Sequence, residues 1–371
     1  MRKSLLAVAV LGAFAANAMA ADVTLYGIVD EGLMYSSVKA GDAKRTHNFS
    51  LDSGIQSGSR WGLKGVEDLG NGYKVGFILE SGFSADNGKM AQDDRLFGRE
   101  ALLYVTGPYG EIGVGRTGGV GAAGVAGRYT KSGMLSALGT SWGNYSTNVP
   151  FSIGEQASRI DNSITYQTPK FAGFQAAVQY SFKMDDKKDT SGVEGKASTN
   201  RFYGASLTYE NGPFAALLSA SSVNYASNDG TTRKDTDDSI EVTLGGSYDF
   251  GVVKVFAAAQ YFDDYQVSSF NSLKNSTTAT YIKGYGLNLS ASAPLAGGTA
   301  ICGLGWVDAE NAAKNTDQDI ERIGFSMGYT YPLSKRTNLY AVAGVGQDKD
   351  KTSETVKTKY YKAGFGLRHR F

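Results

Sequence analysis

Charged side chains recur in segments whose alternate positions are apolar, and the chemistry they offer is the attraction of ions. On the segment 57–69, Arg60 and Lys64 share one side, whereas Trp61 and Leu63 share the other. Charged groups that line an aqueous passage select ions by sign. The two cations are therefore candidates for the wall of a pore.

Two later segments offer further candidates of this kind. Arg159 and Asp161 share the polar side of the segment 158–168. Either Arg99 or Glu100 faces the same way on its own segment, and the apolar pattern around them does not decide between the two.

Arg116 is a conditional candidate. It ends the segment 109–117 on the side of Ile112 and Val114, which is the apolar side. It can reach a polar interior only if the segment has already ended or contains a bulge.

One connection differs from the others in length and composition. Residues 117–157 form a stretch of about forty residues that is rich in glycine, and loops of this length are uncommon unless they are functional. We expect it to fold inward and narrow a lumen, the alternative being a flexible external loop. It carries Arg128 and Lys131 against the single acid Glu155, which predicts a net positive constriction and a weak preference for anions.

The elements that position these residues are predicted to be β-strands, because apolar and polar residues alternate with a period of two. Seven short and eight long connections alternate along the chain, which gives sixteen strands. The predicted strands are 22–37, 57–69, 72–84, 97–107, 109–117, 158–168, 172–184, 200–211, 212–226, 238–250, 251–265, 279–292, 298–308, 320–332, 336–347 and 358–371.

An even number of antiparallel strands with short turns at one end and long loops at the other is typical of a bacterial outer-membrane barrel. An open sheet edge in lipid would leave backbone groups unpaired, so the sheet must close. Sixteen strands enclose an aqueous lumen. We therefore predict an all-β, sixteen-stranded antiparallel transmembrane barrel with an inward-folded third extracellular loop. A soluble secreted β-protein is the alternative for the fold.

The first twenty residues are predicted to be a signal peptide. Arg2 and Lys3 precede an apolar run over 5–16, and small residues at 18–20 suit a signal peptidase. The barrel domain is then expected over 21–371, in the outer membrane of a Gram-negative bacterium and in contact with its lipid.

The composition excludes several classes of function. The 371 residues include 37 Lys and Arg against 36 Asp and Glu, so no basic excess points to nucleic acid. One Cys and two His make a thiolate or multi-histidine metal centre improbable. His47 and His369 have no catalytic arrangement around them, and we expect neither a metal nor a cofactor.

Several short stretches, in order along the whole chain, resemble the Gram-negative general porins. They are LYG (25–27), SRWGLKGVEDLG (59–70), FGR (97–99), GVGR (113–116), YQTPKFAGF (166–174) and GLRHRF (366–371). The resemblance implies a homotrimer of sixteen-stranded diffusion channels, in which small hydrophilic solutes and ions pass a constriction between the third loop and an arginine cluster. That cluster maps to Arg60, Arg99 and Arg116, which brings Arg116 back as a candidate.

The resemblance also implies that the terminal Phe371 is read by the barrel assembly machinery. The third loop departs from the family pattern, because it carries only Glu155 where several acids often face the arginines. Two other functions stay open from the residues alone: an outer-membrane barrel enzyme, such as a protease or lipase, and an adhesin-type structural barrel.

Overall fold

The computed structural model describes residues 23–122, 127–138, 159–188, 192–226, 237–267, 280–312, 318–352 and 357–371. These residues form one antiparallel sheet and a short 3-10 helix, η1 (Ser132–Met134). The strands are β1 (Thr24–Ala40), β2 (Thr46–Ser53), β3 (Arg60–Gly70), β4 (Tyr73–Gly82), β5 (Glu100–Gly107), β6 (Gly110–Thr117), β7 (Ile160–Gln167), β8 (Phe174–Ser181), β9 (Arg201–Asn211), β10 (Phe214–Asn224), β11 (Ile240–Asp249), β12 (Lys254–Val267), β13 (Thr280–Leu295), β14 (Gly298–Asn311), β15 (Asp319–Pro332), β16 (Thr337–Asp350) and β17 (Lys357–Arg370).

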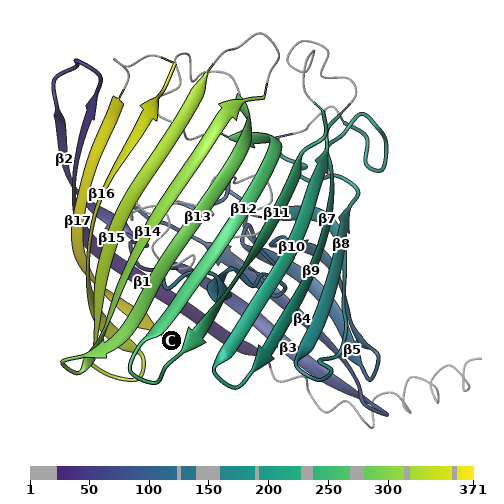
Figure 1. Cartoon of the computed structure of the whole chain (residues 1–371). Helices are drawn as coiled ribbons and strands as arrows, with labels where there is room; N and C mark the ends of the chain where they lie inside the picture. Colours follow the sequence, from purple (N-terminus) through teal and green to yellow (C-terminus); the bar gives the residue numbers. More distant parts are fainter. Residues whose placement is uncertain are drawn as a thin grey trace, which may run out of the picture.

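The sheet closes on itself through β1. One edge of β1 pairs with β17, from Ile28 opposite Arg370 to Ala40 opposite Thr358. Its other edge pairs with β3 near the short turns and with β2 near the long loops. β2 and β3 therefore occupy one position in the wall, and the seventeen strands make the predicted barrel of sixteen (Figure 1).

One predicted connection needs correction. Residues 38–56 were expected to be a loop, but they contain β2, which pairs with β1 from Val38 opposite Thr46 to Glu31 opposite Ser53. The turn over 54–59, in which Gly54 has a φ of 78°, separates β2 from β3. Only Phe49 and Leu51 mark its outward face before the glycine- and serine-rich break, so the alternation is too short for the sequence to reveal this strand.

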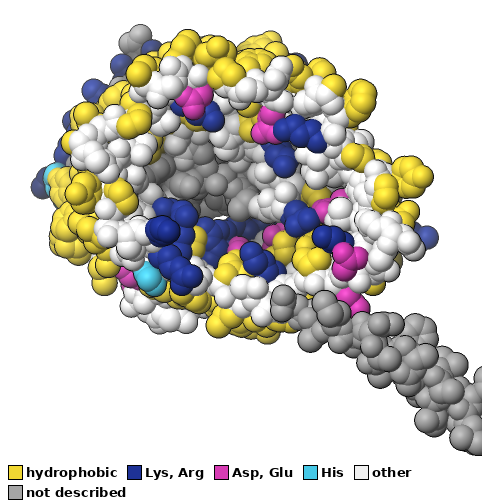
Figure 2. All heavy atoms as spheres, turned by 90° about the horizontal axis from the view of Figure 1, so that it is seen from below, with side chains coloured by type: hydrophobic (Ala, Val, Ile, Leu, Met, Phe, Trp, Pro, Cys, Tyr) yellow, Lys and Arg dark blue, Asp and Glu magenta, His cyan; other side chains and the backbone are white. Residues whose placement is uncertain are grey.

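The two faces of the wall meet different surroundings. Large apolar side chains point outward and are well exposed, as Leu244 (59%), Leu289 (56%) and Phe365 (60%) illustrate. Polar and small residues alternate with them on the inner face. Figure 2 looks into the barrel from the short-turn end and shows apolar side chains around the outside and charged ones in and around the hollow. The period-two pattern thus divides a lipid-facing surface from a wet one.

Among the described residues, no helix is both long and apolar enough to cross a membrane.

Candidate functional site: the pore constriction

The third loop runs through the interior of the barrel. It follows β6, and its described parts are residues 118–122 and 127–138. The backbone N–H of Ala122 donates to Ser219 Oγ on β10 at 3.2 Å, and that of Ala137 donates to Ser290 Oγ on β13 at 2.9 Å. The described loop therefore leaves the wall at β6 and reaches strands that lie across the lumen. Inward folding is confirmed for this part of the loop.

Two leucines anchor the loop by burial. Leu135, which is 1% exposed, packs with Leu217 of β10. Leu138, which is 3% exposed, packs in a cluster with Met34 of β1 and Tyr340 of β16. Full burial of a leucine contributes about 1.5–3 kcal/mol. These contacts fix the loop against both sides of the barrel.

Arg128 ties the loop to the wall by charge. Its Nε donates to Glu111 Oε1 at 2.5 Å, and its second guanidinium nitrogen donates to Oε2 at 2.6 Å. The guanidinium also lies 3.8 Å from the ring centre of Tyr104. The hydrogen bonds with Glu111 raise the pKa of Arg128. Its charge is thus matched within a bidentate pair rather than left to act on passing ions.

A set of cations lines the wall opposite the loop's anchors on β10. Residues directly opposite each other on paired strands present their side chains on the same face. Met34 shows that the even-numbered residues of β1 face inward, because it contacts the third loop. In the ladders that β1 makes with β3 and β17, five cations lie directly opposite even-numbered residues of β1 and therefore face inward. They are Arg60, Lys64, Lys362, Arg368 and Arg370. We call these five residues the basic wall.

The acid nearest to the β3 part of the basic wall is Glu80 of β4. Arg99 Nε donates to Glu80 Oε1 at 2.5 Å, and Arg60 lies 3.9 Å from the same oxygen. The Tyr26 hydroxyl donates to Oε2 at 3.0 Å. Lys64 contacts no acid in this group, and its ammonium lies 5.2 Å from the Tyr26 ring centre. One carboxylate thus serves two arginines. Arg99 immediately precedes β5 and reaches the lumen through this contact. Glu100, the first residue of β5, also faces inward, because it is paired with Glu80.

The second acid, Asp30, is already occupied by hydrogen-bond donors. It accepts from the Tyr340 hydroxyl at 2.6 Å and from the backbone N–H groups of Ser57 at 2.6 Å and Gln56 at 3.1 Å. Arg368 lies close by, where it donates to Ser57 Oγ at 3.3 Å. The basic wall therefore carries more positive charge than these two carboxylates offset.

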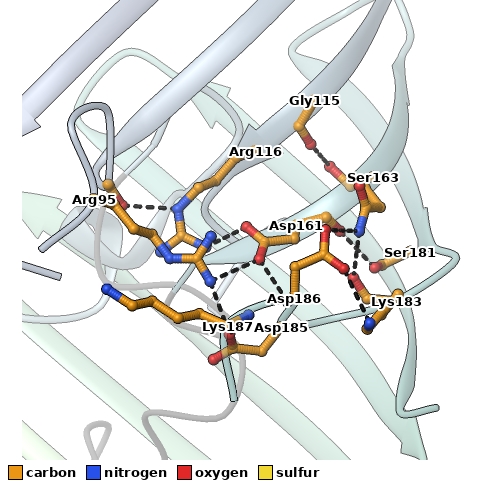
Figure 3. Close-up of polar contacts among 12 residues, drawn as sticks. Arg95, Gly115, Arg116, Asp161, Ser163, Ser181, Lys183, Asp185, Asp186 and Lys187 are labelled. Carbon is orange, nitrogen blue, oxygen red and sulfur yellow. Dashed lines mark hydrogen bonds and ion pairs between the residues drawn. The ribbon is translucent and has the colours of Figure 1, made fainter. Parts of the chain in front are cut away.

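Arg116 belongs to a different group of charges. It is paired with Ala101 in the ladder between β5 and β6, and this position is on the outward face of the wall, the face on which Leu103 lies. The ladder between β6 and β7 is irregular next to it, between Gly115 and Thr117, but this bulge does not bring Arg116 to the basic wall. Its guanidinium donates to Asp161 at 2.5 Å (Figure 3).

Asp161 is the centre of this second group. Arg95, from the loop before β5, lies 3.0 Å from Asp161 and 2.8 Å from Asp185. Figure 3 shows Arg95 and Arg116 converging on Asp161 from different segments. The two arginines and two aspartates compensate one another, so the group fastens the rim of the barrel around β6, β7 and β8.

The remaining candidates lie in or beside the third loop. Arg159 precedes β7, and its Nε is buried with no hydrogen-bond partner. Burial, together with the nearby cations Arg99 and Arg116, lowers the pKa of Arg159. The backbone N–H of Lys131 donates to Gly121 within the loop. Glu155 lies outside the described residues.

Sequence reasoning missed Lys362, Arg368 and Arg370 as site residues, together with the acids Glu80 and Asp30. The signal for the three cations was present, because all occupy the polar parity of the last strand. What was lacking was the register: the predicted closure places the last strand beside the first, but only the observed ladders set Arg370 and Arg60 opposite the same residue, Ile28.

Within the described ranges, no group of three or more His, Cys, Asp or Glu side chains is arranged to hold a metal ion. A closed membrane barrel whose lumen is narrowed by a loop and lined by charge defines a transmembrane channel.

Comparison with known proteins identifies the family. A family model described as Gram-negative porin matches residues 7–351. The chain is 36% identical to an outer membrane porin protein of Bordetella pertussis and 32% identical to outer membrane porin protein 32 of Delftia acidovorans, over the full length of all three. Its fold matches the anion-selective porin from Comamonas acidovorans with a TM-score of 0.68 and 28% identity, over 95% of this chain and 100% of that one. The chain belongs to the Gram-negative porin family.

The fold and the family together establish the general function. The protein resides in the outer membrane and forms a passive, water-filled channel for small hydrophilic solutes and ions.

Proposed function

We propose that this porin prefers anions and that the preference arises between the third loop and the basic wall. The observation that carries the proposal is the charge balance of the inner face of β1, β3, β4 and β17. There, the five cations of the basic wall meet Asp30, Glu80 and, from β2, Asp52, and Arg99 already takes one Glu80 oxygen. Asp68 and Lys74 lie opposite each other at the short-turn end, so their charges cancel. An excess of fixed positive charge raises the local concentration of anions. A relative of similar fold is titled an anion-selective porin, which supports the proposal.

The residues assigned to the constriction divide into two roles. Arg60, Lys64 and Arg159 are proposed to act directly on anions, together with Lys362, Arg368 and Arg370, whereas Arg99, which is paired with Glu80, is proposed to shape the constriction. Arg128 is proposed to position the third loop, and the Arg116–Asp161 pair to brace the rim. Lys131 and Glu155 are proposed to set the charge of the loop itself.

Reversal potentials in a salt gradient test the proposal. Purified protein in a planar bilayer, with potassium chloride more concentrated on one side, is expected to give a reversal potential of the sign set by chloride. A potential of the opposite sign would show a cation preference and would overturn the assignment.

Three further properties are proposed with the channel. Residues 1–20 act as a signal peptide, and residues 21–371 form the mature barrel. The mature chain assembles as a homotrimer; a solved outer membrane protein of Vibrio cholerae with a similar fold is titled a trimer form, which supports this assembly. Phe371 is read by the barrel assembly machinery. Transport by diffusion requires no catalytic group or cofactor, so we assign the channel no enzymatic activity.

A further inference from the structure

The loop between β4 and β5, residues 83–99, contains a backbone conformation that residues other than glycine rarely adopt. Gln92, Asp93 and Asp94 follow one another with φ values of 53°, 61° and 59°, in the left-handed region. Aspartate adopts this region occasionally, so Gln92 is the least expected of the three. A strained segment persists only where its surroundings hold it, and such segments are frequent at functional sites. We call residues 92–94 the left-handed turn.

Two glycines make room for the Gln92 side chain. A Cβ atom on Gly82, at the end of β4, would lie 2.3 Å from Gln92 Oε1 and 3.1 Å from Arg99 Cδ. A Cβ atom on Gly98 would lie 2.6 Å from Gln92 Cβ and 3.1 Å from Arg95 Cβ. Gln92 therefore fills the space between the end of β4 and the segment that leads into Arg99.

The Gln92 side chain acts there by its volume. Its Oε1 atom is buried and has no hydrogen-bond partner among the described residues. Because an unpaired buried acceptor is unfavourable, hydrogen bonding through this atom does not explain why the side chain lies here. What the side chain does is pack against Gly82 and Gly98, and this packing limits where Arg99 can lie.

The segment before β5 is fixed from the rim as well. The Gly98 carbonyl accepts a hydrogen bond from Arg116 Nε at 2.8 Å, and Arg116 in turn pairs with Asp161 (Figure 3). The backbone N–H of Arg99 donates to the Glu80 carbonyl at 3.1 Å. The Arg99 side chain is thus held beside the Glu80 carboxylate by the path of the loop.

The position of Arg99 decides which arginine Glu80 neutralises. Arg99 Nε lies 2.5 Å from Glu80 Oε1, whereas Arg60 lies 3.9 Å from the same atom. If Arg99 moved away, a shift of about 1 Å would bring Arg60 into a hydrogen bond with that oxygen. Glu100 lies directly opposite Glu80 in the ladder and offers the displaced Arg99 another carboxylate. Both arginines would then be paired.

We propose that Gln92 is a positioning residue for ion selectivity: it holds Arg99 on Glu80 and thereby leaves Arg60 free to act on anions. The inference rests on the proposed anion preference and on the role of Arg60 in it. It adds a residue that lies outside the basic wall and carries no charge. Gln92 acts on ions only through the two arginines that compete for Glu80.

Reversal potentials of variants in planar bilayers test the proposal. Glycine adopts a left-handed φ without strain, so Gln92→Gly removes the side chain and suits the turn. It is expected to lower the chloride-to-potassium permeability ratio roughly twofold, as Arg60→Gln does, because both remove the free charge of Arg60. The double variant Gln92→Gly/Arg60→Gln is expected to show no further decrease. An unchanged ratio in Gln92→Gly, or additive effects in the double variant, would overturn the proposal.

Two control variants separate positioning from a general effect on the loop. Gln92→Met keeps the volume of the side chain and is expected to retain the wild-type ratio. Asp94→Gly relieves strain in the same turn and removes an acid, so its ratio is expected to be equal to that of wild type or higher. A fall in the ratio in either variant as large as that in Gln92→Gly would assign the effect to the loop and overturn the role of Gln92.

A further variant keeps the test decisive if Gln92→Gly yields no folded barrel. Gly98→Ala places a methyl group against Gln92 and is expected to lower the ratio in the same way, again without a further decrease when Arg60→Gln is added. A wild-type ratio in Gly98→Ala would overturn the proposal. The two proposals fail separately: a cation preference of wild type would overturn the proposed selectivity, whereas the change between variants and wild type still tests the position of Arg99.

Discussion

Single charges in the interior differ in how far each is already neutralised. Arg99 and Arg128 each meet a carboxylate at hydrogen-bond distance, whereas Lys64 meets the ring of Tyr26. A neutralised cation shapes the pore, while an uncompensated one acts on ions that pass it. The most informative single substitution is therefore one that reverses an uncompensated charge without breaking an ion pair.

Lys64→Glu is such a substitution. The side chain is exposed on the inner face of β3, so the variant is expected to fold. Placing a negative charge there should lower the chloride-to-potassium permeability ratio by a factor of roughly two to five. Reversal potentials measure the change. Lys335→Glu, in an exposed turn at the short-turn end, is the control, and an equal shift in both variants would remove Lys64 from the constriction.

Arg128→Gln should act through position rather than through charge. The change breaks the bidentate pair with Glu111 and leaves that buried carboxylate without its cation. Because the Arg128 side chain is about one-third exposed, we expect a loss of about 1–2 kcal/mol, below the cost of a fully buried pair. The midpoint of heat-induced unfolding should fall, and single-channel currents should become noisier. Lys131→Gln in the same loop is the control; matching behaviour of the two would contradict a loop-fixing role for Arg128.

The strands were largely predictable because lipid outside and water inside impose alternation on every one of them. Each of the sixteen predicted strands overlaps an observed one, and the inward course of the third loop follows from its length and small residues. The pairings were not predictable. Arg128 with Glu111 and Arg116 with Asp161 join segments whose distance depends on loop paths and on a ladder irregularity.

A covalent tether tests whether the third loop stays inside the lumen while the channel conducts. Ala137 and Ser290 are close, since the N–H of one donates to the hydroxyl of the other at 2.9 Å. In a background of Cys302→Ser, the pair Ala137→Cys/Ser290→Cys is expected to form a disulfide on oxidation with little change in conductance. Ser290→Cys alone is the control for the loss of the hydroxyl. A large change in conductance on oxidation, reversed by reductant, would show that the open channel requires the loop to leave this position.

Across the whole molecule, closure creates both the barrel and its site. The β1–β17 ladder completes the wall, and the same ladder brings Arg368 and Arg370 beside the strand that meets Arg60. The charge pattern of the last strand could be seen in the sequence, and the predicted closure places that strand beside the first. The register that sets Arg368 opposite Asp30 and Arg370 opposite Ile28 could not be predicted, because closure alone does not fix it.

Phe371 lies at this closure and has two separable roles. Its backbone N–H and C=O exchange hydrogen bonds of 3.1 Å with Gly27, and its ring fills the space in which a Gly27 side chain would lie. If Phe371 acts mainly as the assembly signal, Phe371→Ala should refold from urea into detergent with nearly normal yield, because the backbone bonds persist. The same variant should nevertheless reach the outer membrane of cells at a much reduced level. Heat-modifiable migration measures both the refolding yield in detergent and the amount of folded barrel in the outer membrane. Leu367→Ala, on the same face of β17, controls for a lost apolar side chain, and poor refolding of Phe371→Ala alone would instead assign Phe371 to holding the closed barrel together.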